Sequence, residues 1–195
     1  MLYLIVIIGL LAFNITPAHT NQIHNLDTRL SSAVVIPKTL SSKDLIYRNG
    51  LGYRKFINIP FTGKITGEEE GYLTGGKWDG PYLSYYQTGQ IEHKGNYKKS
   101  RKDGLWRSFR IDGNIMSEGS YKNGLYEGLW KFYHLFGNNL QMLKNFRNGK
   151  KDGAFKSFYG NGNLMQKGSY KNGKPRGLWI FYEKNGVKER NRKVY

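Results

Sequence analysis

The stretch GSYKNGLYEGLWKFYHLFGNNLQML, residues 119–143, decides the fold because close variants of it recur along most of the chain. Intervals of 24, 24, 25 and 24 residues separate five aligned glycines: Gly80, Gly104, Gly128, Gly153 and Gly177. A second column with the same spacing is aromatic: Tyr97, Tyr121, Phe146 and Tyr170. A constant period of this length indicates a stack of structural repeats.

Each copy contains two segments that are typical of β-strands. The first is an aromatic-rich run such as Leu129–Tyr133, and the second resembles Ile115–Tyr121 and leads into a turn such as Asn123-Gly124. A helix is disfavoured because a glycine about every ten residues would cost roughly 1 kcal/mol each in its interior. We expect an elongated, single-layer antiparallel β-meander of about five repeats and about twelve strands. Equivalent positions in neighbouring repeats should lie about 10 Å apart.

Period-two alternation predicts an aromatic column on one face of the first strand: Trp106, Trp130, Phe155 and Trp179. On the second strand a glycine lies between large residues, as Gly119 does between Ile115 and Tyr121. We expect a ring from the adjoining strand to fill the gap over this glycine. Lys144 interrupts the glycine column in one copy.

Four regions are predicted along the chain. Residues 1–18 contain an apolar run and resemble a secretory signal peptide, which would export the protein to the periplasm, the cell envelope or the medium. An uncleaved signal that anchors the chain in the membrane is the alternative. Residues 19–43 read as a polar linker, residues 44–70 as a capping hairpin and partial repeat, and residues 71–195 as the repeat domain. Asn49-Gly50 marks the hairpin, and the acidic triplet at residues 68–70 is expected to be a solvated turn.

Basic side chains gather at the turns that follow the Tyr column, and the chain has a formal net charge of +17. In a meander these turns share one edge of the sheet, which predicts a basic edge made of Lys98, Lys99, Arg101, Lys102, Lys122, Arg147, Lys150, Lys151, Lys171, Lys174 and Arg176. Such an edge could bind an anionic partner. Alternatively, the lysines only keep an aromatic-rich sheet from aggregating.

No catalytic residue, metal site or cofactor is predicted. The chain has no cysteine, and its four histidines (His19, His24, His93 and His134) are not at ligand spacing, so we expect ordinary polar residues. The carboxylates that precede the aligned glycines are expected to bond the backbone of their own turns: Asp79, Asp103, Glu127 and Asp152. An enzyme is therefore the least favoured class.

The glycine, aromatic strand, Asn-Gly-type turn and Gly-x-Tyr strand of each copy resemble the bacterial variant of the MORN repeat, from about Asp44 to the C-terminus. Residues 44–67, with Asn49-Gly50-Leu51 and Pro60-Phe61-Thr62-Gly63, further resemble the entry segment of the YwqK-family antitoxins. The antitoxin resemblance implies an inhibitor of a toxin enzyme. Eukaryotic MORN proteins imply a second alternative, an anionic lipid-binding module.

The leading expectation is a non-catalytic binding or scaffold protein of the cell envelope. It would use the aromatic face and the basic turn edge to bind a protein or an anionic surface. Nucleic acid would suit the charge and the aromatic residues, but the expected export argues against it. Nothing in the pattern specifies an oligomeric state.

Overall fold

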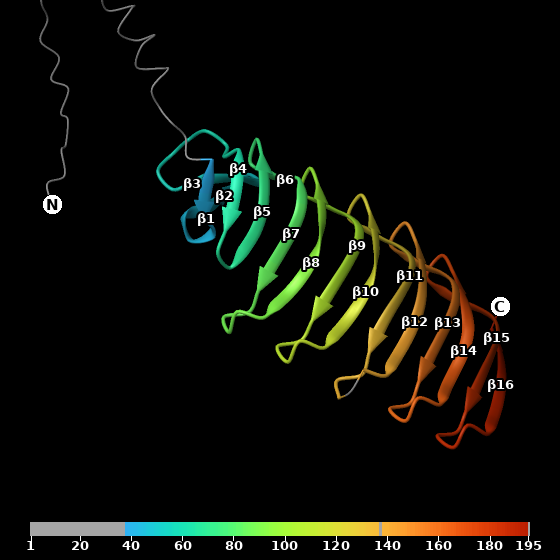
Figure 1. Ribbon diagram of the computed structural model, residues 1–195. Helices are drawn as coiled ribbons and strands as arrows, with labels where there is room; N and C mark the ends of the chain where they lie inside the picture. Colours follow the sequence, from blue (N-terminus) through green and yellow to red (C-terminus); the bar gives the residue numbers. More distant parts are fainter. Residues whose placement is uncertain (1–37, 137, 195) are drawn as a thin grey trace, which may run out of the picture. The chain divides into compact units, whose positions relative to one another are not determined.

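The computed structural model describes residues 38–136 and 138–194 (Figure 1). The predicted signal peptide lies outside these residues, as does the predicted linker up to residue 37. The strands, in chain order, are β1 (Thr39–Ser41), β2 (Leu45–Arg48), β3 (Leu51–Arg54), β4 (Gly63–Thr66), β5 (Glu69–Thr74), β6 (Lys77–Trp78), β7 (Gly80–Tyr85), β8 (Ile91–Lys98), β9 (Arg101–Phe109), β10 (Ile115–Lys122), β11 (Leu125–Tyr133), β12 (Leu140–Arg147), β13 (Lys150–Phe158), β14 (Leu164–Lys171), β15 (Lys174–Tyr182) and β16 (Lys188–Val194). One 3₁₀ turn, η1, covers Ser42–Asp44. In the described part of the chain, no helix is long and apolar enough to cross a membrane.

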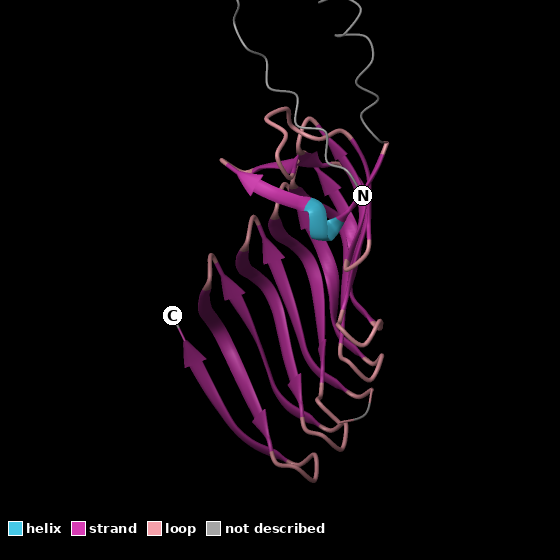
Figure 2. Ribbon diagram, turned by 90° about the vertical axis from the view of Figure 1, so that its left-hand side faces the viewer, coloured by secondary structure: helices cyan, strands magenta, loops and turns pink. Residues whose placement is uncertain are grey.

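Fourteen strands form one open sheet in which, from β7 onward, each strand pairs with the next one in the chain. These pairs are antiparallel, so the predicted single-layer meander is confirmed. Figure 2 shows the strands of this sheet as a series of curved ribbons. The number of strands exceeds the expected twelve because the segment before the repeats contributes several short strands, β1 and β4 to β6.

Two-residue turns on one edge set the register of the repeats. In the turn between β10 and β11, Asn123 has φ 53° and Gly124 has φ 84°. Two successive positive φ values define the hairpin turn whose twist matches that of the strands, and Asn-Gly is its preferred sequence. The strands that flank these two-residue turns reach the turn itself, as β10 and β11 do at Lys122 and Leu125, so they are longer than predicted. Gly128 therefore lies inside β11, where its φ of 69° coincides with a shift in the pairing with β10.

The core is a row of aromatic rings on one face of the sheet. Trp106 and Trp130 are only 2% and 3% exposed, and Tyr121 packs between them at ring-centroid distances of 6.1 and 5.0 Å. Each indole Nε1 donates to a backbone carbonyl at 2.9 Å, that of Asn96 for Trp106 and that of Ser120 for Trp130. The indole nitrogens of Trp106 and Trp130 are thus satisfied within the core, whereas that of Trp179 is buried without a hydrogen-bond partner among the described residues.

A separate hairpin packs against the start of the sheet. It consists of β2 and β3 and turns at Asn49-Gly50, with φ values of 50° and 74°, as the sequence predicted. The amide of Gly52 donates to the carbonyl of Gly76 at 2.8 Å. The hydroxyl of Tyr47 accepts a 2.8 Å hydrogen bond from Trp78 Nε1, which joins the hairpin to the aromatic core.

Two predictions for the region before the repeats are wrong. The end of the expected linker is ordered structure, because Leu40 is buried and β1 pairs in parallel with β4. The acidic triplet is not a solvated turn, since Glu69 and Glu70 begin β5 and pair with β7. The start of this strand was missed because its first two residues are glutamates, whereas strand propensity favours branched and aromatic side chains.

Candidate binding edge

The four two-residue turns that follow β8, β10, β12 and β14 lie on the same edge of the sheet, which we call the turn edge. Strands in an antiparallel meander return to this edge after every second strand, about 10 Å further along. Nine of the eleven predicted basic residues are exposed here: Lys98, Lys99, Arg101, Lys122, Arg147, Lys150, Lys171, Lys174 and Arg176. The structure thus brings together cations that are up to 78 residues apart in the chain.

The other two predicted residues, Lys102 and Lys151, turn inward. Lys102 Nζ lies 4.2 Å from the centroid of the Trp106 ring, and Lys151 Nζ lies 4.3 Å from that of Tyr170. Burial lowers the pKa of Lys102 below its ordinary value. These two ammonium groups stabilise the aromatic row by cation–π contact. Their assignment to the basic edge is therefore wrong: alternation points them toward the core face.

Backbone hydrogen bonds tie each turn to the preceding repeat. The amide of the second turn residue donates to a carbonyl 22 or 23 residues earlier, as Gly124 does to Lys102 at 2.8 Å and Gly149 does to Tyr126 at 2.9 Å. Ser100 and Gly173 make the equivalent bonds at 2.7 Å. This ladder fixes the spacing of the turns, so their exposed side chains form a regular array.

Carboxylates reinforce the ladder. Glu127 Oε2 accepts a 2.9 Å hydrogen bond from the amide of Asn148, and Asp152 Oδ2 accepts one of 3.3 Å from the amide of Asn172. Glu127 and Asp152 thus cap the turn of the next repeat, and for these two residues the expectation that they bond their own turns is wrong. The amide of Asn172 and the ammonium of Lys171 hold the pKa of Asp152 below its ordinary value. Exposed cations on this edge outnumber its carboxylates Asp103, Glu127 and Asp152 by three to one.

Basic residues directly oppose each other at three of the four hairpin ends. The pairs that flank the turns are Lys98 with Arg101, Arg147 with Lys150, and Lys171 with Lys174. In the remaining hairpin Lys122 faces Leu125. Like charges that face each other across a strand pair are destabilising. We call the three like-charged pairs the clamp pairs.

The opposite edge carries a different ladder that the sequence did not reveal. Tyr86, Arg110, His134 and Tyr159 occupy equivalent positions after their strands, and each bonds a backbone carbonyl of the next repeat at 2.7–3.0 Å. His134 Nε2 lies 3.0 Å from the carbonyl of Phe158, so this histidine is a structural hydrogen-bond donor. Three different residue types, Tyr, Arg and His, make this bond, which is why no motif marked the position.

The tryptophan column of the aromatic face is not available for binding. Trp106, Trp130 and Trp179 are buried, with exposures of 2, 3 and 6%. The second aromatic column of this face, Tyr97, Tyr121, Phe146 and Tyr170, is half-buried, so a contact there stays a prediction. The other face instead exposes a leucine in three repeats, with Leu105, Leu129 and Leu178 exposed by 53, 46 and 54%.

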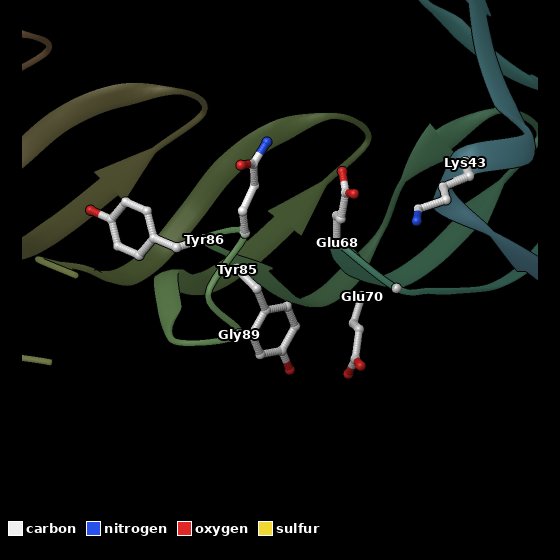
Figure 3. A pocket seen from close by; sticks show the side chains of 8 residues that line it. Lys43, Glu68, Glu70, Tyr85, Tyr86 and Gly89 are labelled. Atoms are coloured by element: carbon white, nitrogen blue, oxygen red, sulfur yellow. The ribbon is translucent and has the colours of Figure 1, made fainter. Parts of the chain in front are cut away.

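A cavity of about 590 Å³ lies beside the acidic triplet, and Lys43, Glu68, Glu70 and Tyr85 line it. In Figure 3 the carboxylates of Glu68 and Glu70 point away from each other. Glu69 is engaged elsewhere, because its Oε1 accepts a 2.6 Å hydrogen bond from the hydroxyl of Tyr82. The three carboxylates therefore do not converge on one point.

These features define an open, antiparallel repeat sheet with one basic edge. Within this class, three segments of the chain match the family model described as MORN repeat variant: residues 78–99, 102–123 and 151–172. The matches support a MORN-repeat protein, and such repeats are generally found in binding or scaffold proteins. The repeat with Lys144 and Phe155 in place of a glycine and a tryptophan lies partly between the matched segments. No curated protein matches the chain.

Proposed function

We propose that the protein is a non-catalytic binding protein that contacts an anionic partner through its turn edge. The observation that carries the proposal is the array of nine exposed cations on turns that are spaced by the backbone ladder. Positive charge in this arrangement attracts negatively charged groups from solution and accelerates their encounter. The attraction should weaken as salt rises, because exposed charges are screened.

Two further observations favour binding over a role in solubility alone. Glu127 and Asp152 direct their oxygens at turn amides, which leaves most of the exposed cations without an acidic neighbour in the described residues. Of the eleven predicted basic residues, only Lys171 forms an ion pair within the described residues, with 3.3 Å between its Nζ and Asp152 Oδ2. The edge thus presents nine exposed cations against three carboxylates, of which Glu127 and Asp152 are engaged by turn amides.

The partner is expected at the cell envelope, because residues 1–18 resemble a signal peptide. An exported protein would meet anionic proteins, polymers and lipid head groups there. The envelope location is part of the proposal and can be tested separately by cell fractionation.

The test compares two variants of equal charge. The edge variant carries Lys122→Glu, Lys150→Glu and Arg176→Glu, and the control variant carries Lys94→Glu, Lys156→Glu and Lys184→Glu at exposed positions away from the turn edge. We expect partners captured from the protein's own cell extract to be lost by the edge variant and kept by the control. Recovery of the same partners by both variants would refute the proposal.

A further inference from the structure

We infer that the three clamp pairs bind a linear polyanion, one anionic group at each pair. This inference rests on the proposed function and names the class of partner. Its starting point is that like charges face each other in the clamp pairs, which is unfavourable in the free protein; among the six residues, only Lys171 has an ion-pair partner in the described part of the chain, Asp152 at 3.3 Å. An anion seated between two cations would remove this repulsion and gain charge-assisted hydrogen bonds from both.

The fold does not require these pairs. The hairpin between β10 and β11 has the same turn geometry, yet Leu125 stands opposite Lys122. A single cation, or none, is therefore compatible with the turn. The repeated placement of two cations is a cost to stability that the architecture does not explain, and binding of an anion would explain it.

The first turn also contains backbone strain that lowers the stability of the free protein. Asn148 and Asn172 begin the turns of the other two clamp hairpins, whereas Lys99 begins the first turn with a φ of 50°. Asparagine tolerates this left-handed conformation far better than lysine does. The exposed Lys99 thus adds a third cation to the Lys98–Arg101 pair at the expense of backbone strain.

The arrangement of the clamp pairs favours a thin chain of negative charge over a broad surface. Each of the three clamp hairpins presents one pair, and the pairs follow the edge in single file over about 30 Å, with the Lys122–Leu125 hairpin between the first and the second. The carboxylate of Asp103 lies on the strand just inside the first pair, two residues from Arg101. It would repel a wide anionic plane, such as a lipid surface, but not a chain that runs along the tips of the turns.

Inorganic polyphosphate is a suitable probe because it is linear and its length can be chosen. A chain that spans about 30 Å should bind at least about tenfold more tightly per phosphate than tripolyphosphate, because only the long chain engages several clamp pairs. A clamp variant with Arg101→Glu, Lys150→Glu and Lys174→Glu should lose at least about tenfold in affinity, since its three contacts are replaced by repulsion. The control variant with Lys94, Lys156 and Lys184 changed to Glu should keep its affinity within a factor of about two.

Binding is measured by isothermal titration calorimetry at physiological salt with both lengths of polyphosphate. Sedimentation with phosphatidylglycerol vesicles provides the comparison with an anionic lipid surface. Equal affinity per phosphate for the two lengths, or equal losses in the clamp and control variants, would overturn the inference. Binding to the vesicles without binding to polyphosphate would also overturn it, although the proposed function would survive. Loss of polyphosphate binding in the clamp variant alone, with an unchanged circular dichroism spectrum, is the supporting result.

Discussion

The indole ring of Trp130 occupies the space above Gly119: a Cβ added to this glycine would lie 2.2 Å from Trp130 Cδ2. The same relationship joins Gly95 with Trp106 and Gly168 with Trp179. The aromatic core of the sheet therefore depends on a column of glycines that lets each indole lie flat on the backbone of its neighbouring strand.

Replacing Gly119 with Val should lower the free energy of unfolding by about 1–3 kcal/mol, because the added side chain must displace the indole of Trp130. Ser120 is exposed on the opposite face, so Ser120→Val is the matched control and should have a much smaller effect. Thermal or urea denaturation of the two variants provides the comparison. Equal destabilisation would show that the ring does not need the glycine.

Lys144 and Phe155 replace the glycine and the tryptophan in the fourth repeat and lie opposite each other. Lys144→Gly alone should destabilise the sheet, because it leaves a gap that a phenyl ring does not fill. Phe155→Trp alone should also destabilise it, since Lys144 blocks the indole. Together the two changes should restore the pattern of the other repeats, with a favourable coupling energy of about 0.5–3 kcal/mol in a double-mutant cycle. Additive effects would contradict this.

Phe56 is 99% exposed and has a φ of 66°. The left-handed conformation costs a residue with a Cβ roughly 1–2 kcal/mol, and asparagine is among the residues that tolerate it best. Phe56→Asn should therefore raise the melting temperature. The neighbouring Lys55 is exposed without a positive φ, so Lys55→Asn should leave the melting temperature unchanged. An unchanged or lower melting temperature for Phe56→Asn would refute strain at this position.

Glu118 should make the protein sensitive to acid. Its carboxylate accepts hydrogen bonds of 3.0 Å from Lys131 Nζ, Arg107 Nε and the hydroxyl of Tyr133. The bond to Lys131 is the main cause that holds the pKa of Glu118 below its ordinary value of 4.5. A carboxyl group whose pKa is lower in the folded state stabilises the fold above its unfolded pKa and loses this contribution as pH falls through the folded pKa.

Glu118→Gln removes this titration and should therefore be less stable than the parent protein at pH 7. The difference in melting temperature should shrink as pH falls below about 4.5, where the carboxyl of the unfolded parent protein becomes protonated, until the folded carboxyl is protonated as well at lower pH. Melting curves of both proteins between pH 7 and pH 3 provide the measurement. A difference that stays constant over this range would mean that Glu118 does not change its charge in that interval.

The sequence predicted the repeat, the antiparallel meander and the contact over Gly119 because each depends on local spacing: a period of 24 residues, Asn-Gly turns and alternation along a strand. It failed where partners come from the neighbouring repeat. Glu127 caps the turn at Asn148, and His134 bonds the carbonyl of Phe158. Such contacts require the pairing register, which composition and spacing do not contain.

For the candidate site, too, the sequence predicted some features correctly and missed others. The topology alone placed the turns on one edge, and nine of the eleven basic residues are exposed there. Lys102 and Lys151 were misassigned because both are one residue past the exposed position that follows the turn, so that alternation points them toward the core rings. The clamp pairs were overlooked because they appear only when residues are paired across each hairpin.

The most direct test of the turn edge as a binding surface is to measure both stability and binding for the clamp variant with Arg101, Lys150 and Lys174 changed to Glu. These changes convert each like-charged pair into an opposite-charged pair, which should add roughly 0.2–1 kcal/mol per pair to the stability. We expect a higher melting temperature together with loss of polyphosphate binding. A melting temperature that stays the same or falls while polyphosphate binding is retained would contradict the role of the turn edge as a binding surface.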